Sequence, residues 1–193
     1  GNTRPSTVFD PSLLSGSSSR PDDWQIGVAV QQEIAPRMSV EVSYNRRWWN
    51  RFVDATDNMI TSAADYDSFN LTAPSDARLP GGGGYSVGPF YDVRPALAGQ
   101  SSNVVYNVDE YGEYVRYWHG VDVNFVARLR SGLMVQGGTS TGRLVQNTCE
   151  IRTSLPEFSL LNYACDTAPP FLTDFRGLAS YTIPKIDVQT SVT

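Results

Sequence analysis

The strongest constraint on the fold is a side-chain alternation of period two that recurs in separate runs along the chain. In the first run, residues 24–34, apolar side chains occupy alternate positions: Trp24, Ile26, Val28, Val30 and Ile34. Successive side chains of a strand point to opposite faces, so this run predicts a β-strand with one apolar and one polar face. Similar runs span residues 38–49, 121–129, 133–143, 171–183 and 186–193, which gives about six strands.

The connections between these runs alternate between short and long. Short turns fall at residues 35–37, 130–132 and 184–185, whereas the connections 50–113 and 144–170 are long. Strands joined by such short turns form antiparallel hairpins, so all short turns lie at one end of the sheet and both long loops at the other. We therefore predict an all-β fold, an antiparallel meander over residues 24–193. Residues 1–23, rich in Ser and Pro, are expected to form an irregular lead-in.

Aromatic residues concentrate at the long-loop ends of the predicted strands. They are Trp24, Trp48, Trp49, Phe52, Tyr114, Tyr117, Trp118 and Phe171. Tyr and Trp favour membrane interfaces, and the strand lengths fit the ~9–11 residues that cross a bilayer. The pattern predicts a segment of a transmembrane β-barrel, and a segment only, because the smallest such barrels have about eight strands. A soluble sandwich also alternates its faces, but it gives no reason for aromatics on one rim.

Composition excludes several other classes of protein. The net charge is −5, which argues against a nucleic-acid partner. Two cysteines and one histidine exclude cysteine-rich zinc sites and most histidine-clustered metal sites.

Several stretches resemble the barrel strands of TonB-dependent receptors, in particular the Oar-like group that carries a carboxypeptidase-regulatory-like domain. The matching residues in the first two predicted strands and their turn are Arg20-Pro21, Trp24, Val28 and Glu33, the turn Pro36-Arg37, and Val40, Val42, Tyr44 and Arg47. Residues 72–85, with the tetraglycine 81–84, and residues 119–123 are also similar to that group, as are residues 128–133, 137–143 and 180–184. The resemblance covers residues 20–193.

This resemblance implies a place in the bacterial outer membrane and a role in ligand uptake. The parent barrel would have roughly 22 strands, with outer-membrane lipid around it, and would enclose an N-terminal plug through which TonB acts. The plug and the TonB box are absent from these 193 residues. We accordingly expect a barrel segment of a receptor, without enzymatic activity.

Loop 50–113 carries nine acidic residues against three arginines. Such a loop either attracts cations, or becomes ordered around a calcium ion bound by its carboxylate oxygens, or is simply a solvated surface. The calcium candidates are Asp54, Asp57, Asp65 and Asp67; no other cofactor is expected. The residues expected to face a ligand are Trp48, Trp49, Asp65, Asp67, Tyr85, Tyr111, Trp118 and His119.

Cys149 and Cys165 lie 16 positions apart in loop 144–170. In an oxidising compartment they are expected to form a disulfide that stiffens the loop, stabilising it by about 3 kcal/mol.

Two alternative functions remain open from the sequence. The first is a soluble all-β binding module for a carbohydrate or a protein. The second is a serine hydrolase, because Gly138-Thr139-Ser140-Thr141-Gly142 matches the nucleophile-elbow motif G-x-S-x-G. That motif needs a following helix, and none is predicted, so a Ser140–His119–Asp122 triad would depend on the strands aiming all three side chains at one point.

Overall fold

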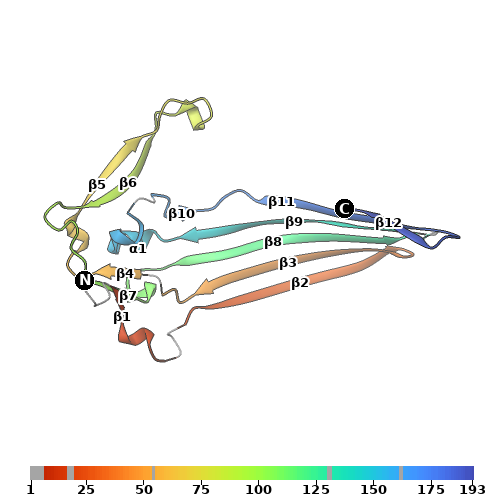
Figure 1. Cartoon of the computed structure of the whole chain (residues 1–193), viewed down its shortest axis with the longest axis horizontal. Helices are drawn as coiled ribbons and strands as arrows, with labels where there is room; N and C mark the ends of the chain where they lie inside the picture. The colour runs from red at the N-terminus through yellow and green to blue at the C-terminus, as the bar shows by residue number, and fades with distance from the viewer. Residues whose placement is uncertain (1–6, 17–19, 54, 130–131, 161–162) are drawn as a thin grey trace. The chain divides into compact units, whose positions relative to one another are not determined.

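The computed structural model describes residues 7–16, 20–53, 55–129, 132–160 and 163–193 (Figure 1). Strands make up 56% of the chain and helical segments 13%, which confirms the predicted all-β class. The chain divides into two compact units. The loop unit consists of Gly1–Asp22, Trp49–Arg116 and Gln146–Thr167, and the sheet unit of Asp23–Trp48, Tyr117–Val145 and Ala168–Thr193.

The sheet unit is built on six strands that follow one another in the order of the chain. Their spatial order is β12-β11-β9-β8-β3-β2, so each strand lies beside its neighbour in sequence, as predicted for a meander. The strands are β2 (Asp22–Ala35), β3 (Met38–Asn50), β8 (Val115–Arg128), β9 (Leu133–Asn147), β11 (Leu172–Ile183) and β12 (Val188–Val192). The β3–β8, β9–β11 and β11–β12 pairs are all antiparallel.

The register of the strands separates an apolar face from a polar face. Val40, Val42 and Tyr44 of β3 stand opposite Phe125, Val123 and Val121 of β8, on one face. Glu41 and Ser43 stand opposite Asn124 and Asp122, on the other face. These pairings match the faces that the alternation predicts.

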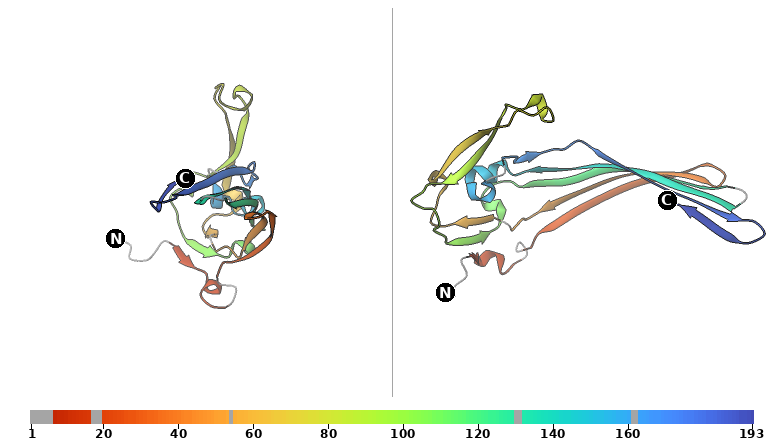
Figure 2. Two further views of the ribbon diagram at one scale, coloured as in Figure 1. Left: turned by 90° about the vertical axis from the view of Figure 1, so that its right-hand side faces the viewer. Right: turned by 45° about the horizontal axis from the view of Figure 1, so that its top comes forward.

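The sheet unit is a single layer of strands (Figures 1 and 2). Among the described residues, Ala127 is the only buried apolar side chain that belongs to it. Large apolar side chains are exposed instead, including Val28 at 62%, Val30 at 68% and Phe175 at 78%. The sheet unit therefore has no hydrophobic core of its own.

The loop unit, in contrast, contains a buried core. Phe52, Ala55, Val108, Ile151 and Leu155 form it, and Trp49, Tyr111, Tyr114 and Phe158 pack against it. The rings of Phe52 and Tyr114 stack with their centroids 3.9 Å apart. Three of the aromatics assigned to a membrane rim from the sequence, Trp49, Phe52 and Tyr114, thus contribute to a protein core instead.

Short elements build the loop unit. A three-stranded sheet of order β1-β7-β4 and a β5–β6 hairpin account for most of its strands. The elements are β1 (Thr7–Phe9), β4 (Ala55–Asn58), β5 (Tyr66–Thr72), β6 (Ser86–Val93), β7 (Asn103–Tyr106), β10 (Asp166–Thr167), helix α1 (Cys149–Ser154) and 3-10 turns at Pro11–Leu13, Ala63–Asp65, Pro80–Gly82, Val108–Glu110 and Pro156–Ser159.

The connections differ from the sequence-based expectation in three places. The lead-in is not wholly irregular, because β1 pairs in parallel with β7. Strand β9 extends to Asn147 rather than ending near residue 143. Loop 50–113 contains regular strands and a share of a core, although its sequence shows no sustained period.

Cys149 and Cys165 form the predicted disulfide. Next to it, the Thr148 N–H donates to the Cys165 carbonyl at 2.8 Å, and β10 pairs with the last residues of β9. The crosslink therefore closes the segment that carries α1. Within the described part of the chain, none of the helices is long and apolar enough to cross a membrane.

Candidate functional site

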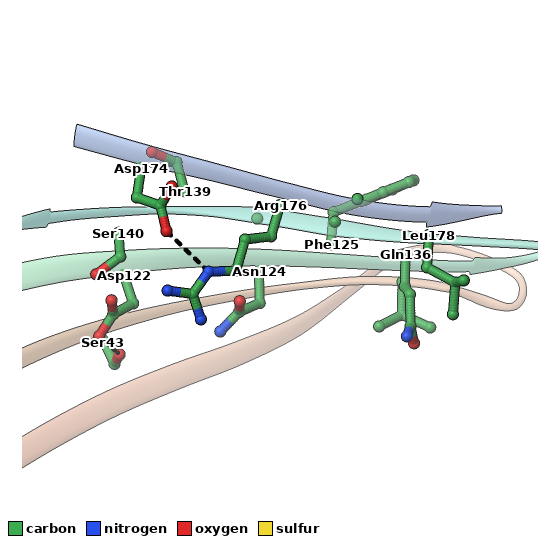
Figure 3. Close-up of a pocket in the computed structure, with 14 residues that line it drawn as sticks. Ser43, Asp122, Asn124, Phe125, Gln136, Thr139, Ser140, Asp174, Arg176 and Leu178 are labelled. Carbon is green, nitrogen blue, oxygen red and sulfur yellow. Dashed lines mark hydrogen bonds and ion pairs between the residues drawn. The ribbon is translucent and has the colours of Figure 1, made fainter. Parts of the chain in front are cut away.

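The polar face of the sheet unit contains a hollow of about 570 Å³, which we call the polar pocket (Figure 3). Strands β3, β8, β9 and β11 line it. Its side chains include Ser43, Asp122, Asn124, Gln136, Ser140, Asp174, Arg176 and Leu178. Gly138 leaves room for the Asn124 side chain, because a Cβ there would lie 2.6 Å from the Asn124 side-chain oxygen.

Asp122 is held in place by two neighbours on β3. The Asn45 side-chain amide donates to Asp122 Oδ2 at 2.8 Å, and the Ser43 hydroxyl lies 3.5 Å from the same oxygen. Both donors contact Oδ2, which leaves Oδ1 as an acceptor for a donor group of a ligand.

Arg176 and Asp174 form a surface ion pair at the side of the pocket. The Arg176 Nε donates to Asp174 Oδ2 at 2.8 Å, and the Arg176 side chain is 85% exposed. The two terminal nitrogens of Arg176 have no acceptor among the described residues and point into the pocket, away from Asp174 (Figure 3). The pocket thus offers carboxylates, amides and a guanidinium to a polar ligand.

Trp118 extends the polar face toward the long-loop end of the sheet. A Cβ added at Gly142 would lie 2.5 Å from the Trp118 ring, and one at Gly120 would lie 2.7 Å from it. The indole therefore rests on two glycine positions, which leave room for it. Of the eight residues predicted to face a ligand, Trp118 alone lies on the face that carries the polar pocket.

The other seven predicted residues lie away from the polar face, some in the sheet unit and some in the loop unit. Trp48 and His119 lie on the apolar face of the sheet unit, since they share the alternation of Tyr44 and Val121. Trp49 and Tyr111 pack against the core of the loop unit. Asp65, Asp67 and Tyr85 occupy the loop unit as well, in its β5–β6 part.

The strands separate the three residues of the hypothetical hydrolase triad. Ser140 and Asp122 both line the polar pocket. His119 lies three positions before Asp122 on the regularly paired strand β8, so its side chain projects from the opposite face. On that face, its Nε2 accepts a hydrogen bond from Arg143 Nε at 3.1 Å.

The three calcium candidates among the described residues each have a separate partner. Asp57 accepts from the Tyr111 hydroxyl at 2.8 Å, and Asp67 lies 3.4 Å from Arg94 Nε. Asp65 accepts from both the backbone N–H and the hydroxyl of Ser62 at 2.8 Å, which lowers the pKa of its carboxyl. Asp54 lies outside the described residues. No three His, Cys, Asp or Glu residues of the described ranges gather to hold a metal ion.

Glu157 organises a polar cluster inside the loop unit. It accepts hydrogen bonds from the Tyr66 hydroxyl at 2.5 Å, from the Thr61 hydroxyl at 3.3 Å and from the Asn58 backbone N–H. Burial, followed by the bond to Glu157, raises the pKa of Tyr66 to about 12. Burial and Asp57 likewise raise the pKa of Tyr111.

Sequence reasoning identified part of the polar pocket and missed the rest. The alternation placed Ser43, Asp122 and Asn124 on the polar face. Asp174 and Arg176 were not singled out, although their spacing of two on a strand was a signal that they share a face. The Glu157 cluster had no such signal, since its members are up to 99 positions apart.

Comparison of the chain with protein-family models, with curated proteins and with solved structures finds no match.

Proposed function

We propose that this chain is a segment of an outer-membrane β-barrel receptor of the TonB-dependent kind, which takes up a ligand. The proposal combines the resemblance of residues 20–193 with one structural observation. The sheet unit is a single antiparallel layer whose apolar face is exposed along its length.

The exposed apolar face is evidence that this face of the sheet unit contacts lipid. Leaving one large apolar side chain in water rather than burying it costs about 1.5–3 kcal/mol. Many such side chains are exposed in the sheet unit, among them Ile26, Val28, Val30, Val42, Val121, Phe175 and Val188. Hydrocarbon would remove this cost, while neighbouring strands satisfy each other's backbone hydrogen bonds; in this proposal the outer edges of β2 and β12 pair with further strands of the parent barrel.

The charged residues on the opposite face are evidence that this face lines a water-filled barrel interior. Glu41, Asp122 and Asp174 lie on it together with Arg176. Charged side chains on the lipid face at mid-bilayer would cost about 2–4 kcal/mol for an arginine or lysine, so their place on the polar face fits a barrel interior. In this proposal the polar pocket and Trp118 contact the ligand or the N-terminal plug of the parent chain, and TonB acts through that plug.

The proposal is tested by labelling adjacent positions of one strand. Val42→Cys and Ser43→Cys each carry a nitroxide, and the 193-residue chain is reconstituted in phosphatidylcholine bilayers. Their side chains project from opposite faces. We expect oxygen, which concentrates in hydrocarbon, to relax the label at 42, and a water-soluble nickel chelate to relax the label at 43.

Val123→Cys and Asn124→Cys provide a matched pair on the neighbouring strand, since they stand opposite Val42 and Glu41. Equal access of the nickel chelate to both members of each pair would contradict a membrane-embedded sheet.

A soluble all-β binding module is the second candidate, and the polar pocket favours it. Asp122, Asn124 and Arg176 could bind the hydroxyls of a carbohydrate, with Trp118 as a stacking surface. The exposed apolar face weighs against it, because a soluble module would bury that face.

A further inference from the structure

A cationic and aromatic cluster lies on the apolar face of the sheet unit, outside the polar pocket. It combines two arginines and a histidine with three aromatic rings. Its members are Arg46, Trp48, Tyr117, His119, Arg143 and Phe171, which we call the rim cluster.

Register places the rim cluster on the apolar face. Arg46 stands directly opposite His119, two positions along from the pair Tyr44 and Val121. Arg143 joins them through its hydrogen bond to His119 at 3.1 Å. The cluster therefore continues the apolar surface at the end of the strands from which the long connections leave.

Aromatic rings hold both guanidinium groups in position. The Arg46 guanidinium carbon lies 4.9 Å from the Tyr117 ring centre and 5.7 Å from that of Trp48. The guanidinium carbon of Arg143 lies 4.7 Å from the ring centre of Phe171. Cation–π contacts of this kind orient a guanidinium and leave its N–H groups available in the ring-free directions.

The two arginines lack an anionic partner. Among the described residues, neither Arg46 nor Arg143 has a carboxylate within 4 Å, and the imidazole between them accepts a hydrogen bond rather than supplying negative charge. By contrast, Arg47, whose side chain points to the polar face, is paired with Asp23 at 2.7 Å. Two uncompensated positive charges at the margin of an apolar surface are complementary to a ligand that is anionic at one end and apolar along its length.

We propose that the rim cluster binds the phosphate group of a membrane lipid whose acyl chains lie along the adjacent apolar face. The guanidinium fork of an arginine matches phosphate oxygens, and basic residues among interfacial aromatics bind anionic headgroups. A free anion or an acidic protein would use the charge but leave the apolar face uncovered. The inference rests on the proposed function, because it requires the apolar face to contact lipid.

The test measures how the 193-residue chain, delivered from detergent, distributes onto vesicles. The vesicles are phosphatidylcholine alone, phosphatidylcholine with phosphatidic acid, and phosphatidylcholine with diacylglycerol, which has the same apolar chains without the phosphate. We expect binding to the phosphatidic acid vesicles to be about 30-fold tighter, since each arginine contributes a factor of about five near an anionic surface.

Matched variants assign the preference to the rim cluster. Arg46→Gln/Arg143→Gln is expected to lose it, and Arg46→Lys/Arg143→Lys is expected to restore most of it. Arg78→Gln/Arg94→Gln removes the same charge from two exposed arginines of the loop unit that already pair with Asp76 and Asp67, and is expected to retain it. Far-UV circular dichroism verifies the β-structure of each variant.

Every other outcome contradicts either lipid binding by the rim cluster or the proposed function. A preference that survives Arg46→Gln/Arg143→Gln, or that Arg78→Gln/Arg94→Gln abolishes equally, assigns it to general charge. Displacement by inorganic phosphate, but not by chloride at equal ionic strength, assigns the site to a free anion. Equal binding to all three vesicles contradicts phosphate binding by the rim cluster but not the proposed function. Failure to bind any vesicle contradicts both.

Discussion

At the scale of single residues, Glu157 accepts three hydrogen bonds from separate parts of the loop unit. One carboxylate receives donors from β4, from the segment after it and from β5. A hydrogen bond to a charged acceptor contributes more than one between neutral groups. Glu157 therefore links the two long connections independently of the apolar core.

Glu157→Gln is expected to lower the pKa of Tyr66 from about 12 toward 10, because it removes a negative charge that disfavours the phenolate. In the wild type, the unfolded state loses the Tyr66 proton near pH 10 and the folded state near pH 12. The contribution to stability is therefore complete below pH 10 and is lost as pH rises to 12. The ¹³Cζ shift of Tyr66, followed by NMR against pH, measures the change.

Glu150→Gln is the control for this substitution, since Glu150 accepts from the backbone N–H of Glu113 rather than from a tyrosine. An unchanged Tyr66 titration in Glu157→Gln would mean that burial alone raises the pKa.

The sequence predicted residue positions well wherever they follow strand alternation. Val42, Ser43, Asp122 and Val123 all occupy the expected faces, because alternation depends only on local backbone geometry. Side-chain roles set by distant parts of the chain were not predictable. Phe52, for example, was assigned to a membrane rim and instead packs with Val108 and Ile151.

At the scale of elements, the disulfide and helix α1 together stabilise the core of the loop unit. Cys149 begins α1, and Ile151 within the helix is fully buried in the core of the loop unit. The Cys165 carbonyl accepts the Thr148 N–H just before the helix. The crosslink thus restricts the unfolded chain at the helix that supplies Ile151 to the core and is followed directly by Leu155.

Cys149→Ser/Cys165→Ser is expected to destabilise the loop unit by about 3 kcal/mol, the value for a ring of this size. Amide hydrogen exchange in α1 and β10 is expected to accelerate by roughly two orders of magnitude, with 1.4 kcal/mol for each factor of ten. Reducing agent should reproduce this acceleration in the wild type and should have no effect on the double variant. Unchanged exchange after reduction would show that the core holds α1 without the crosslink.

The order and pairing of the six long strands were predictable because each hairpin is local in sequence. The short elements of the loop unit were not. Strand β1 pairs with β7, and Thr7 and its partner Asn103 are 96 positions apart. The four-residue strands β4 and β7 carry too little alternation to be recognised.

At the scale of the whole molecule, the two units differ in how they are stabilised. Nearly all buried apolar side chains of the described residues belong to the loop unit, whereas the sheet unit exposes apolar ones. An exposed apolar surface of this kind requires a partner or a lipid environment.

Removal of detergent is accordingly expected to convert a monodisperse chain into large assemblies, because exposed apolar faces of different molecules then cover one another. Analytical ultracentrifugation with and without dodecyl maltoside measures the change. The exposed Val28→Asp/Val30→Asp variant should assemble less than the wild type, and Gln25→Asp/Gln31→Asp, with the same added charge on the other face, should not. A monodisperse wild-type monomer in plain buffer would favour the soluble binding module.

The core of the loop unit can form only late in the synthesis of the chain. Phe52 emerges from the ribosome long before Ile151, and the two meet only after β8 and β9 have been synthesised. Contacts this distant in sequence close slowly, because the intervening chain must first be brought together. Until then Phe52, Ala55 and Val108 lack the cover of Ile151 and Leu155, so we expect a chaperone to bind most usefully between the synthesis of β7 and that of α1.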